Sequence, residues 1–161
     1  MVINFKVLNM GLHDCYQSYI GKWIAPPRNK VFKIEAQSYF LTKMVDEEQY
    51  LEIRFESGTP LRLHYWRFNI IIDILTEAKG EYVMIGSRIN PQETHTIEGS
   101  LVCEAHEKGY PYANLRTAPF ICDLVVLCGY AIYGYMNNPE TGRRVQGIKI
   151  QTKKMSVNKK L

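Results

Sequence analysis

Long apolar runs are missing from this sequence, and none approaches the ~20 residues that a membrane-spanning helix needs. The first residues, from Met1 to Lys6, also lack the basic and then apolar arrangement of a secretory signal peptide. These two absences predict a protein that does not associate with a membrane. We expect it in the cytoplasm, or in the interior of a host cell if the chain is viral.

Several motifs of enzymes and nucleotide-binding proteins are missing too. The chain contains no P-loop, no glycine fingerprint of a dinucleotide-binding fold and no nucleophile elbow. Common routes to nucleotide binding and to serine hydrolysis are therefore not indicated. These absences favour a non-enzymatic protein without a cofactor.

Acidic residues are absent from the C-terminal end. The segment from Arg143 to Leu161 holds seven basic residues and no acidic one, whereas the rest of the chain carries the other 13 basic residues and all 16 acidic ones. A body with a formal charge of −3 thus ends in a strand and tail, residues 143–161, with a charge of +7. Such basic segments often contact nucleic acid or another polyanion.

What the sequence does contain is a pattern of short β-strands. Its 161 residues, 46% of them hydrophobic, suit one globular domain over 1–161. We expect strands over 2–8, 30–37 and 81–89, a helix over 10–20, a strand running into a helical turn over 94–105, and either a buried strand or a short helix over 68–75. Because long crossovers are missing, the predicted fold is mainly β: an antiparallel barrel, or a strongly curled antiparallel sheet, with one or two short helices.

The clearest pattern covers residues 49–66. Leu51, Ile53 and Phe55 alternate with charged residues, and after Ser57-Gly-Thr-Pro60 the alternation resumes with Leu61, Leu63 and Tyr65. Two half-buried antiparallel strands joined by a tight turn show this period of two. We predict a hairpin in which Leu51, Ile53, Phe55, Leu61 and Leu63 are buried.

A second, longer hairpin is predicted to close the fold. Residues 119–136 are rich in β-branched and aromatic side chains, residues 137–142 are typical of a turn, and residues 143–154 become apolar again. If the tyrosines of its first strand share a face with the lysines of its second, aromatic rings lie beside cations. Rings stack on unpaired bases and cations meet phosphates, which favours a module that binds single-stranded nucleic acid. The candidate contact residues are Tyr133, Tyr135, Arg143, Arg144, Lys149, Lys153 and Lys154.

One alternative is a Mg²⁺-dependent nuclease. Thr117-Ala-Pro-Phe-Ile-Cys-Asp123, followed later by Gln151-Thr-Lys153, resembles the PD-(D/E)xK nuclease pattern. The resemblance implies that Asp123 is a metal ligand, that Gln151 substitutes for the second ligand, that Lys153 stabilises charge and that Glu104 is the helix carboxylate. Magnesium is the cofactor that this alternative requires.

A zinc site is not expected. Cys103 and His106 have ligand-like spacing, but Cys122 and Cys128, if they lie on one strand, are roughly 20 Å apart. Tetrahedral zinc needs its sulfurs within ~2.3 Å of one ion.

The remaining alternative is a structural subunit of a larger protein assembly. Exposed strand edges of an antiparallel sheet can pair with other copies or other chains. In this case the protein forms a homo-oligomer through its sheet edges.

Overall fold

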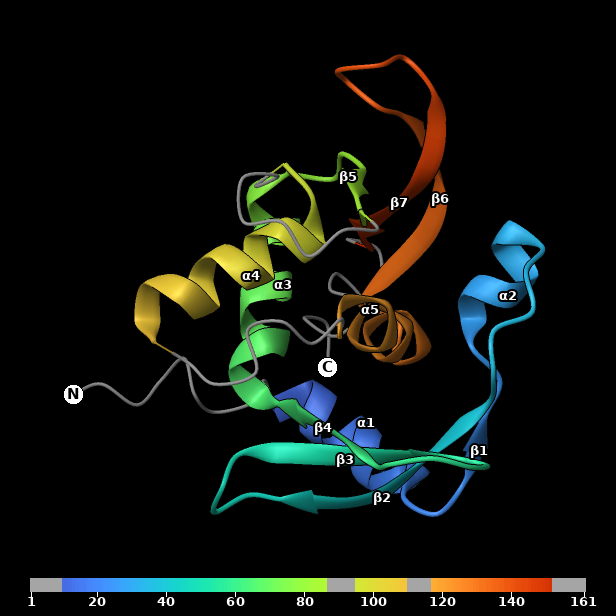
Figure 1. Ribbon diagram of the computed structural model, residues 1–161, viewed down its shortest axis with the longest axis vertical. Coiled ribbons are helices and arrows are strands. Elements are labelled where there is room, and N and C mark those ends of the chain that lie inside the picture. The colour runs from blue at the N-terminus through green and yellow to red at the C-terminus, as the bar shows by residue number, and fades with distance from the viewer. Residues whose placement is uncertain (1–9, 87–94, 110–116, 152–161) are drawn as a thin grey trace, which may run out of the picture. The chain divides into compact units, whose positions relative to one another are not determined.

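A computed structural model describes residues 10–86, 95–109 and 117–151 (Figure 1). This part of the chain contains five helices and seven strands, in the order α1 (Met10–Tyr19), β1 (Trp23–Ile24), α2 (Pro27–Phe32), β2 (Tyr39–Val45), β3 (Tyr50–Phe55), β4 (Leu61–His64), α3 (Tyr65–Glu77), β5 (Val83–Met84), α4 (Ile97–Lys108), α5 (Ala118–Leu127), β6 (Ala131–Asn137) and β7 (Arg144–Ile150). These elements form two compact units, one up to Ile70 and one from Ile71 onward. No helix among the described residues has the length and apolar character needed to cross a membrane.

The first unit holds a four-stranded antiparallel sheet in the order β1-β2-β3-β4. The hairpin predicted over residues 49–66 is confirmed as β3 and β4, with Ile53 opposite Leu61. Leu51, Ile53 and Leu63 are fully buried, while Phe55 and Leu61 are partly buried. The predicted burial is therefore confirmed for three of the five residues, while Glu52, on the face predicted to be polar, is only 8% exposed.

The strand predicted to reach Trp66 ends two residues earlier, at His64, and α3 begins at Tyr65. Phe68, Ile71 and Leu75 are all fully buried, and their spacing of three and four residues is that of one helix face. The helical alternative for residues 68–75 is thus confirmed. The ring of Phe68 packs 5.6 Å from that of Tyr16 in α1, so the aromatic core of this unit joins two helices.

Two other expectations for this unit had different outcomes. The helix predicted over residues 10–20 is confirmed as α1, which ends just before Gly21, a glycine with a positive φ of 82°. The strand predicted over residues 30–37 is wrong, because α2 occupies 27–32 with Pro27 in its first turn. The strand predicted over 2–8 lies outside the described residues.

The second unit contains the largest departure from the predicted fold. Residues 118–127, expected as the first part of a long strand, form α5, with Pro119 in the first turn of the helix. Proline is favoured there because its missing N–H needs no helical partner. A short apolar run that is buried on all sides has no polar period, so it does not distinguish a buried strand from a buried helix.

Helix α4 replaces the strand and turn predicted over residues 94–105. The hydroxyl of Thr96 caps its first turn by accepting a hydrogen bond of 2.9 Å from the backbone N–H of Gly99. Gly109 ends the helix in the left-handed conformation, with φ 67°. These two residues are a recognisable start and stop signal on either side of the twelve helical residues.

A three-stranded antiparallel sheet, in the order β5-β7-β6, completes the second unit. The returning half of the predicted hairpin is confirmed as β6 and β7, joined by a turn in which the N–H of Asn138 donates to the carbonyl of Arg143 over 2.7 Å. The short β5 pairs with β7 at Ile148 and Gly147, so the end of the hairpin near the turn extends beyond it (Figure 1). The strand predicted over 81–89 is therefore present only as β5 within the described residues.

The predicted fold class is wrong. The described residues form an α+β fold with two separate antiparallel sheets and five helices, and their strands do not close into a barrel. The error comes from residues 27–32, 97–108 and 118–127, which contain β-branched and apolar residues at positions where helix capping and burial decide the conformation.

Candidate functional site

The β6–β7 hairpin carries most of the described basic and aromatic candidates, and its register decides which of them share a face. Tyr133 lies opposite Ile148, and Tyr135 lies opposite Gln146. Directly opposed residues in an antiparallel pair project to the same side of the sheet. The odd-numbered residues of β6 therefore share a face with the even-numbered residues of β7, and Lys149 lies on the other face. The predicted juxtaposition of Tyr133 and Tyr135 with Lys149 is wrong.

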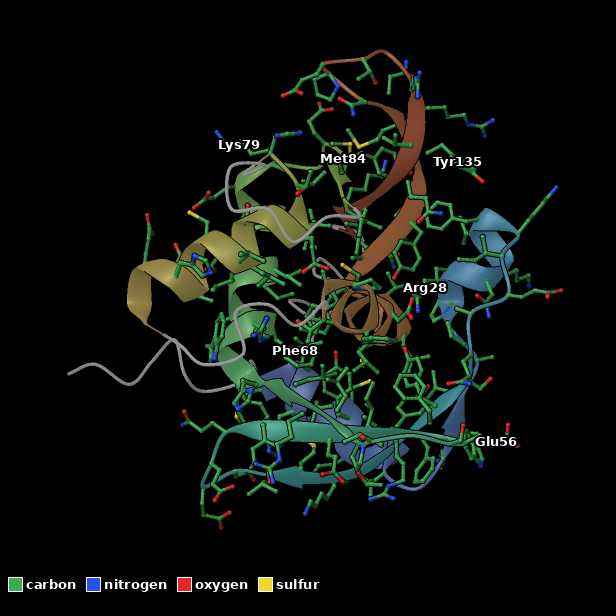
Figure 2. The ribbon with its side chains drawn as sticks, viewed as in Figure 1. Arg28, Glu56, Phe68, Lys79, Met84 and Tyr135 are labelled. Carbon is green, nitrogen blue, oxygen red and sulfur yellow. The ribbon has the colours of Figure 1, made fainter. Side chains whose placement is uncertain are left out.

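A different cation accompanies Tyr135. The guanidinium carbon of Arg144 lies 3.9 Å from the centroid of the Tyr135 ring, close enough for cation–π stacking. The Tyr135 side chain is 40% exposed and projects from the hairpin (Figure 2). One face of the hairpin thus presents an exposed ring with a stacked guanidinium. A second exposed arginine, Arg143, lies at the end of the turn.

The opposite face carries a second cation–aromatic pair. The Lys149 ammonium lies 4.7 Å from the centroid of the Tyr82 ring. Gly134 and Gly147 oppose each other beneath this ring, and a Cβ atom added at Gly134 would overlap the ring of Tyr82. The two glycines leave bare backbone on which the ring lies, and this is a recognised use of glycine within strands. Tyr82 was not a candidate from the sequence, because it precedes the hairpin by about fifty residues.

Tyr133 has a structural role rather than an exposed one. It is only 7% exposed, and its hydroxyl donates a hydrogen bond of 2.7 Å to a carboxylate oxygen of Asp123, a fully buried residue of α5. Buried tyrosines usually satisfy their hydroxyl in this way. The pair ties α5 to β6 and leaves little of the Tyr133 ring for a base to stack on.

The nuclease alternative assigned roles to residues that the structure places in other settings. Asp123 lies in a helix instead of at the start of a strand, and it already accepts the hydrogen bond of Tyr133. Glu104 lies in α4, and Gln151 follows β7, with its backbone N–H donating to the carbonyl of Tyr130 over 2.9 Å. Lys153 and Lys154 lie outside the described residues.

The separation of roughly 20 Å predicted for Cys122 and Cys128 is wrong. Because Cys122 lies in α5 and Cys128 caps it, six positions span ~9 Å along the helix axis rather than the predicted strand distance. Cys103 and Cys122 are not joined in a disulfide, and burial, with the nearby Glu107 and Glu104, raises the pKa of the Cys103 thiol. A raised pKa disfavours the thiolate that binds metals. The described residues contain no group of three His, Cys, Asp or Glu side chains placed to hold a metal ion, and the absence of zinc stays a prediction.

A cavity of about 580 Å³ lies beside the turn of the hairpin. Its lining comes from β5, from the residues that start α4, and from the hairpin, where Glu140 is the acidic side chain of the turn. A carboxylate oxygen of Glu140 lies 3.9 Å from Nε2 of His95 across this cavity.

The first unit contains a polar site that the sequence did not indicate. The Asp46 carboxylate accepts hydrogen bonds from Nε2 of His13 over 2.9 Å and from the Tyr65 hydroxyl over 2.7 Å. These two bonds lower the pKa of Asp46, and burial together with Asp46 raises the pKa of Tyr65. Asp46 follows His13 by 33 positions and precedes Tyr65 by 19, so no local motif could reveal the three residues.

His64 gives this unit a predicted dependence on pH. Burial, and then the charges of Arg67 and Arg62, lower the pKa of His64 below its ordinary value near 6.5. Between its folded pKa and 6.5, the unfolded chain binds more protons than the folded one, so acidification favours unfolding. We expect the stabilisation to be complete above pH ~6.5 and to be lost as the pH falls through the folded pKa.

Urea unfolding at a series of pH values measures this effect. The free energy of unfolding should fall less between pH ~7.5 and ~5.5 in His64→Gln than in the wild type. His106→Gln, which removes an exposed imidazole, is the matched control and should keep the wild-type fall. Equal pH profiles for His64→Gln and the wild type would contradict the assignment to His64.

Comparisons of the chain with protein-family models, with curated proteins and with solved structures each found no match. The function proposed below therefore depends on the residues of this chain and their geometry alone.

Proposed function

We propose that the β6–β7 hairpin binds single-stranded nucleic acid, or another polyanion of similar charge, and that the protein acts as a non-enzymatic binding module. The observation that carries this proposal is the Arg144 guanidinium stacked 3.9 Å from the ring of the exposed Tyr135. Unpaired bases stack on aromatic rings and on guanidinium planes, and arginine binds phosphate with two parallel hydrogen bonds. The pair thus offers both kinds of contact at one place.

The distribution of charge supports the same reading. Arg143 and Arg144 are adjacent and exposed, Lys149 lies on the opposite face, and the segment that begins at Arg143 contains no acidic residue. A strand of phosphates that approaches the hairpin therefore meets cations on both faces. Electrostatic attraction of this kind supplies most of the affinity of sequence-independent binding and makes it depend on salt.

Fluorescence anisotropy of a labelled oligothymidylate, titrated at several salt concentrations, tests the proposal. Arg144→Ala should weaken binding and reduce the log–log salt slope by about 0.7, the contribution of one neutralised phosphate on a single strand. Tyr135→Ala should weaken binding by roughly 1–3 kcal/mol, with a smaller change in slope.

Two variants control for indirect effects. Arg54→Ala removes an exposed arginine from β3 in the other unit and should leave affinity and slope unchanged. Tyr133→Phe removes the buried hydroxyl that bonds Asp123, so it should reduce stability and leave the affinity of the folded protein unchanged. An absence of binding at low salt would exclude the proposal and leave assembly through a sheet edge, such as that of β6 in the described sheet, as the remaining hypothesis.

A further inference from the structure

We propose that a cavity in the first unit binds a small organic cation rich in N–H donors, of the amidinium or guanidinium class. The cavity has a volume of about 390 Å³ and lies among α1, the turn between β2 and β3, and the first residue of α3. This volume falls in the range of small-molecule sites, about 300–1,000 Å³. The hairpin of the second unit has no part in it, so this inference is independent of nucleic-acid binding.

The carboxylate of Asp46 is held ready for a ligand. Both of its hydrogen-bond donors, Tyr65 and His13, bond the same oxygen, Oδ1, and they come from two different helices. Within the described residues Oδ2 makes no hydrogen bond. Two fixed donors restrict the carboxylate to one orientation, so a ligand does not have to order it. The second oxygen is therefore a preorganised acceptor on a side chain that lines the cavity and is 57% exposed.

His13 donates to Asp46 from Nε2 and also lines the cavity. The lining also includes the carboxylate of Asp14 and the side-chain amides of Gln17 and Gln49. Among the described residues that line the cavity there is no lysine or arginine. Acceptors and negative charge without a permanent cation select a positively charged ligand with several N–H groups.

Two further features of the cavity lining fit a ligand site, and the first suits a ligand with an apolar part. Met10 lines the cavity and is 74% exposed, which gives a flexible apolar surface for a ring or an alkyl chain. Gln49 has a φ of 59°, a conformation that non-glycine residues rarely adopt, and its carbonyl accepts from the N–H of Tyr65 over 2.8 Å. Backbone strain of this kind persists only where the surroundings fix it, and it is concentrated at ligand sites.

Isothermal titration with benzamidinium tests the proposal, and benzamide is its neutral isostere. We expect benzamidinium to bind at least about tenfold more tightly than benzamide, because hydrogen bonds between charged partners are stronger. Benzoate should not bind. Equal affinities for benzamidinium and benzamide, or no benzamidinium binding at millimolar concentration, would overturn the proposal without any variant.

Two variants test whether the ligand binds in the cavity. Asp46→Asn keeps the size of the side chain and an oxygen for His13 and Tyr65, but removes the charge, so benzamidinium binding should weaken by about tenfold or more. Glu35→Gln removes an exposed charge elsewhere in the unit and should bind as the wild type does. A thermal melt verifies that each variant is folded. Unchanged affinity in folded Asp46→Asn would refute the assigned site.

Discussion

Replacing Ile53 by Ala is expected to lower the free energy of unfolding by about 2–5 kcal/mol. Ile53 is fully buried in β3 and lies opposite Leu41 on β2 and Leu61 on β4, so its side chain belongs to the centre of the four-stranded sheet. Removing three carbons there leaves a cavity that neighbouring strands fill only in part. Both tryptophans, Trp23 and Trp66, lie in the same unit, and their fluorescence during urea denaturation reports the loss directly.

The matched control is Ile34→Ala. Ile34 is 37% exposed and lies outside the helices and strands, so the same chemical change should cost less than about 0.5 kcal/mol. A loss of similar size in both variants would show that Ile53 does not pack in the core as the sheet register requires.

The second large effect is expected for Ile148→Ala, at about 2–5 kcal/mol. Ile148 is fully buried at the middle of β7, where it pairs with Tyr133 on one side and Val83 on the other. It therefore touches every strand of the smaller sheet. Amide hydrogen exchange of residues 131–150 measures the local loss of protection.

Ile132→Ala is the control for this variant, because Ile132 is 36% exposed on the opposite face of β6. This substitution should lower the free energy of unfolding by less than about 0.5 kcal/mol. Unfolding of Ile148→Ala is also followed by tryptophan fluorescence, which reports on the first unit. The comparison with hydrogen exchange shows whether the two units unfold together. Coincident transitions would support the single domain expected from the chain length, and separate transitions would contradict it.

The elements that the sequence predicted well have a clear period. The alternation from Leu51 to Leu63 identified both strands and their buried face, and the spacing of Phe68, Ile71 and Leu75 is compatible with the helix that forms. Where a segment is buried all round, as in residues 118–127, the pattern disappears and the conformation depends on capping and tertiary contacts. Thr96 and Gly109 show that the caps of α4 are readable in the sequence, although the pattern over 94–105 predicts a strand that runs into a helical turn.

The candidate sites were predictable only in composition. The excess of basic residues from Arg143 onward is a property of the sequence, but which tyrosine meets which cation depends on the register of β6 and β7. A shift of the pairing by one residue would move every side chain of one strand to the opposite face of the sheet. The contact of Tyr82 with Lys149 and that of His13 with Asp46 join segments distant in the chain, and a single sequence contains no signal for them.

The bare backbone at Gly134 and Gly147 limits how the hairpin can vary during evolution. A side chain at position 134 would require the ring of Tyr82 to move, and one at position 147 would require the end of the Met136 side chain to move. Both changes would disturb the base of the hairpin, where Lys149 is held. The turn carries no such restriction at Gly142, where an added Cβ meets no atom within 4 Å and only the positive φ of 74° favours glycine. Sequence drift and insertions should therefore accumulate in the turn, so the hairpin can change the groups it presents to a ligand while its base stays fixed.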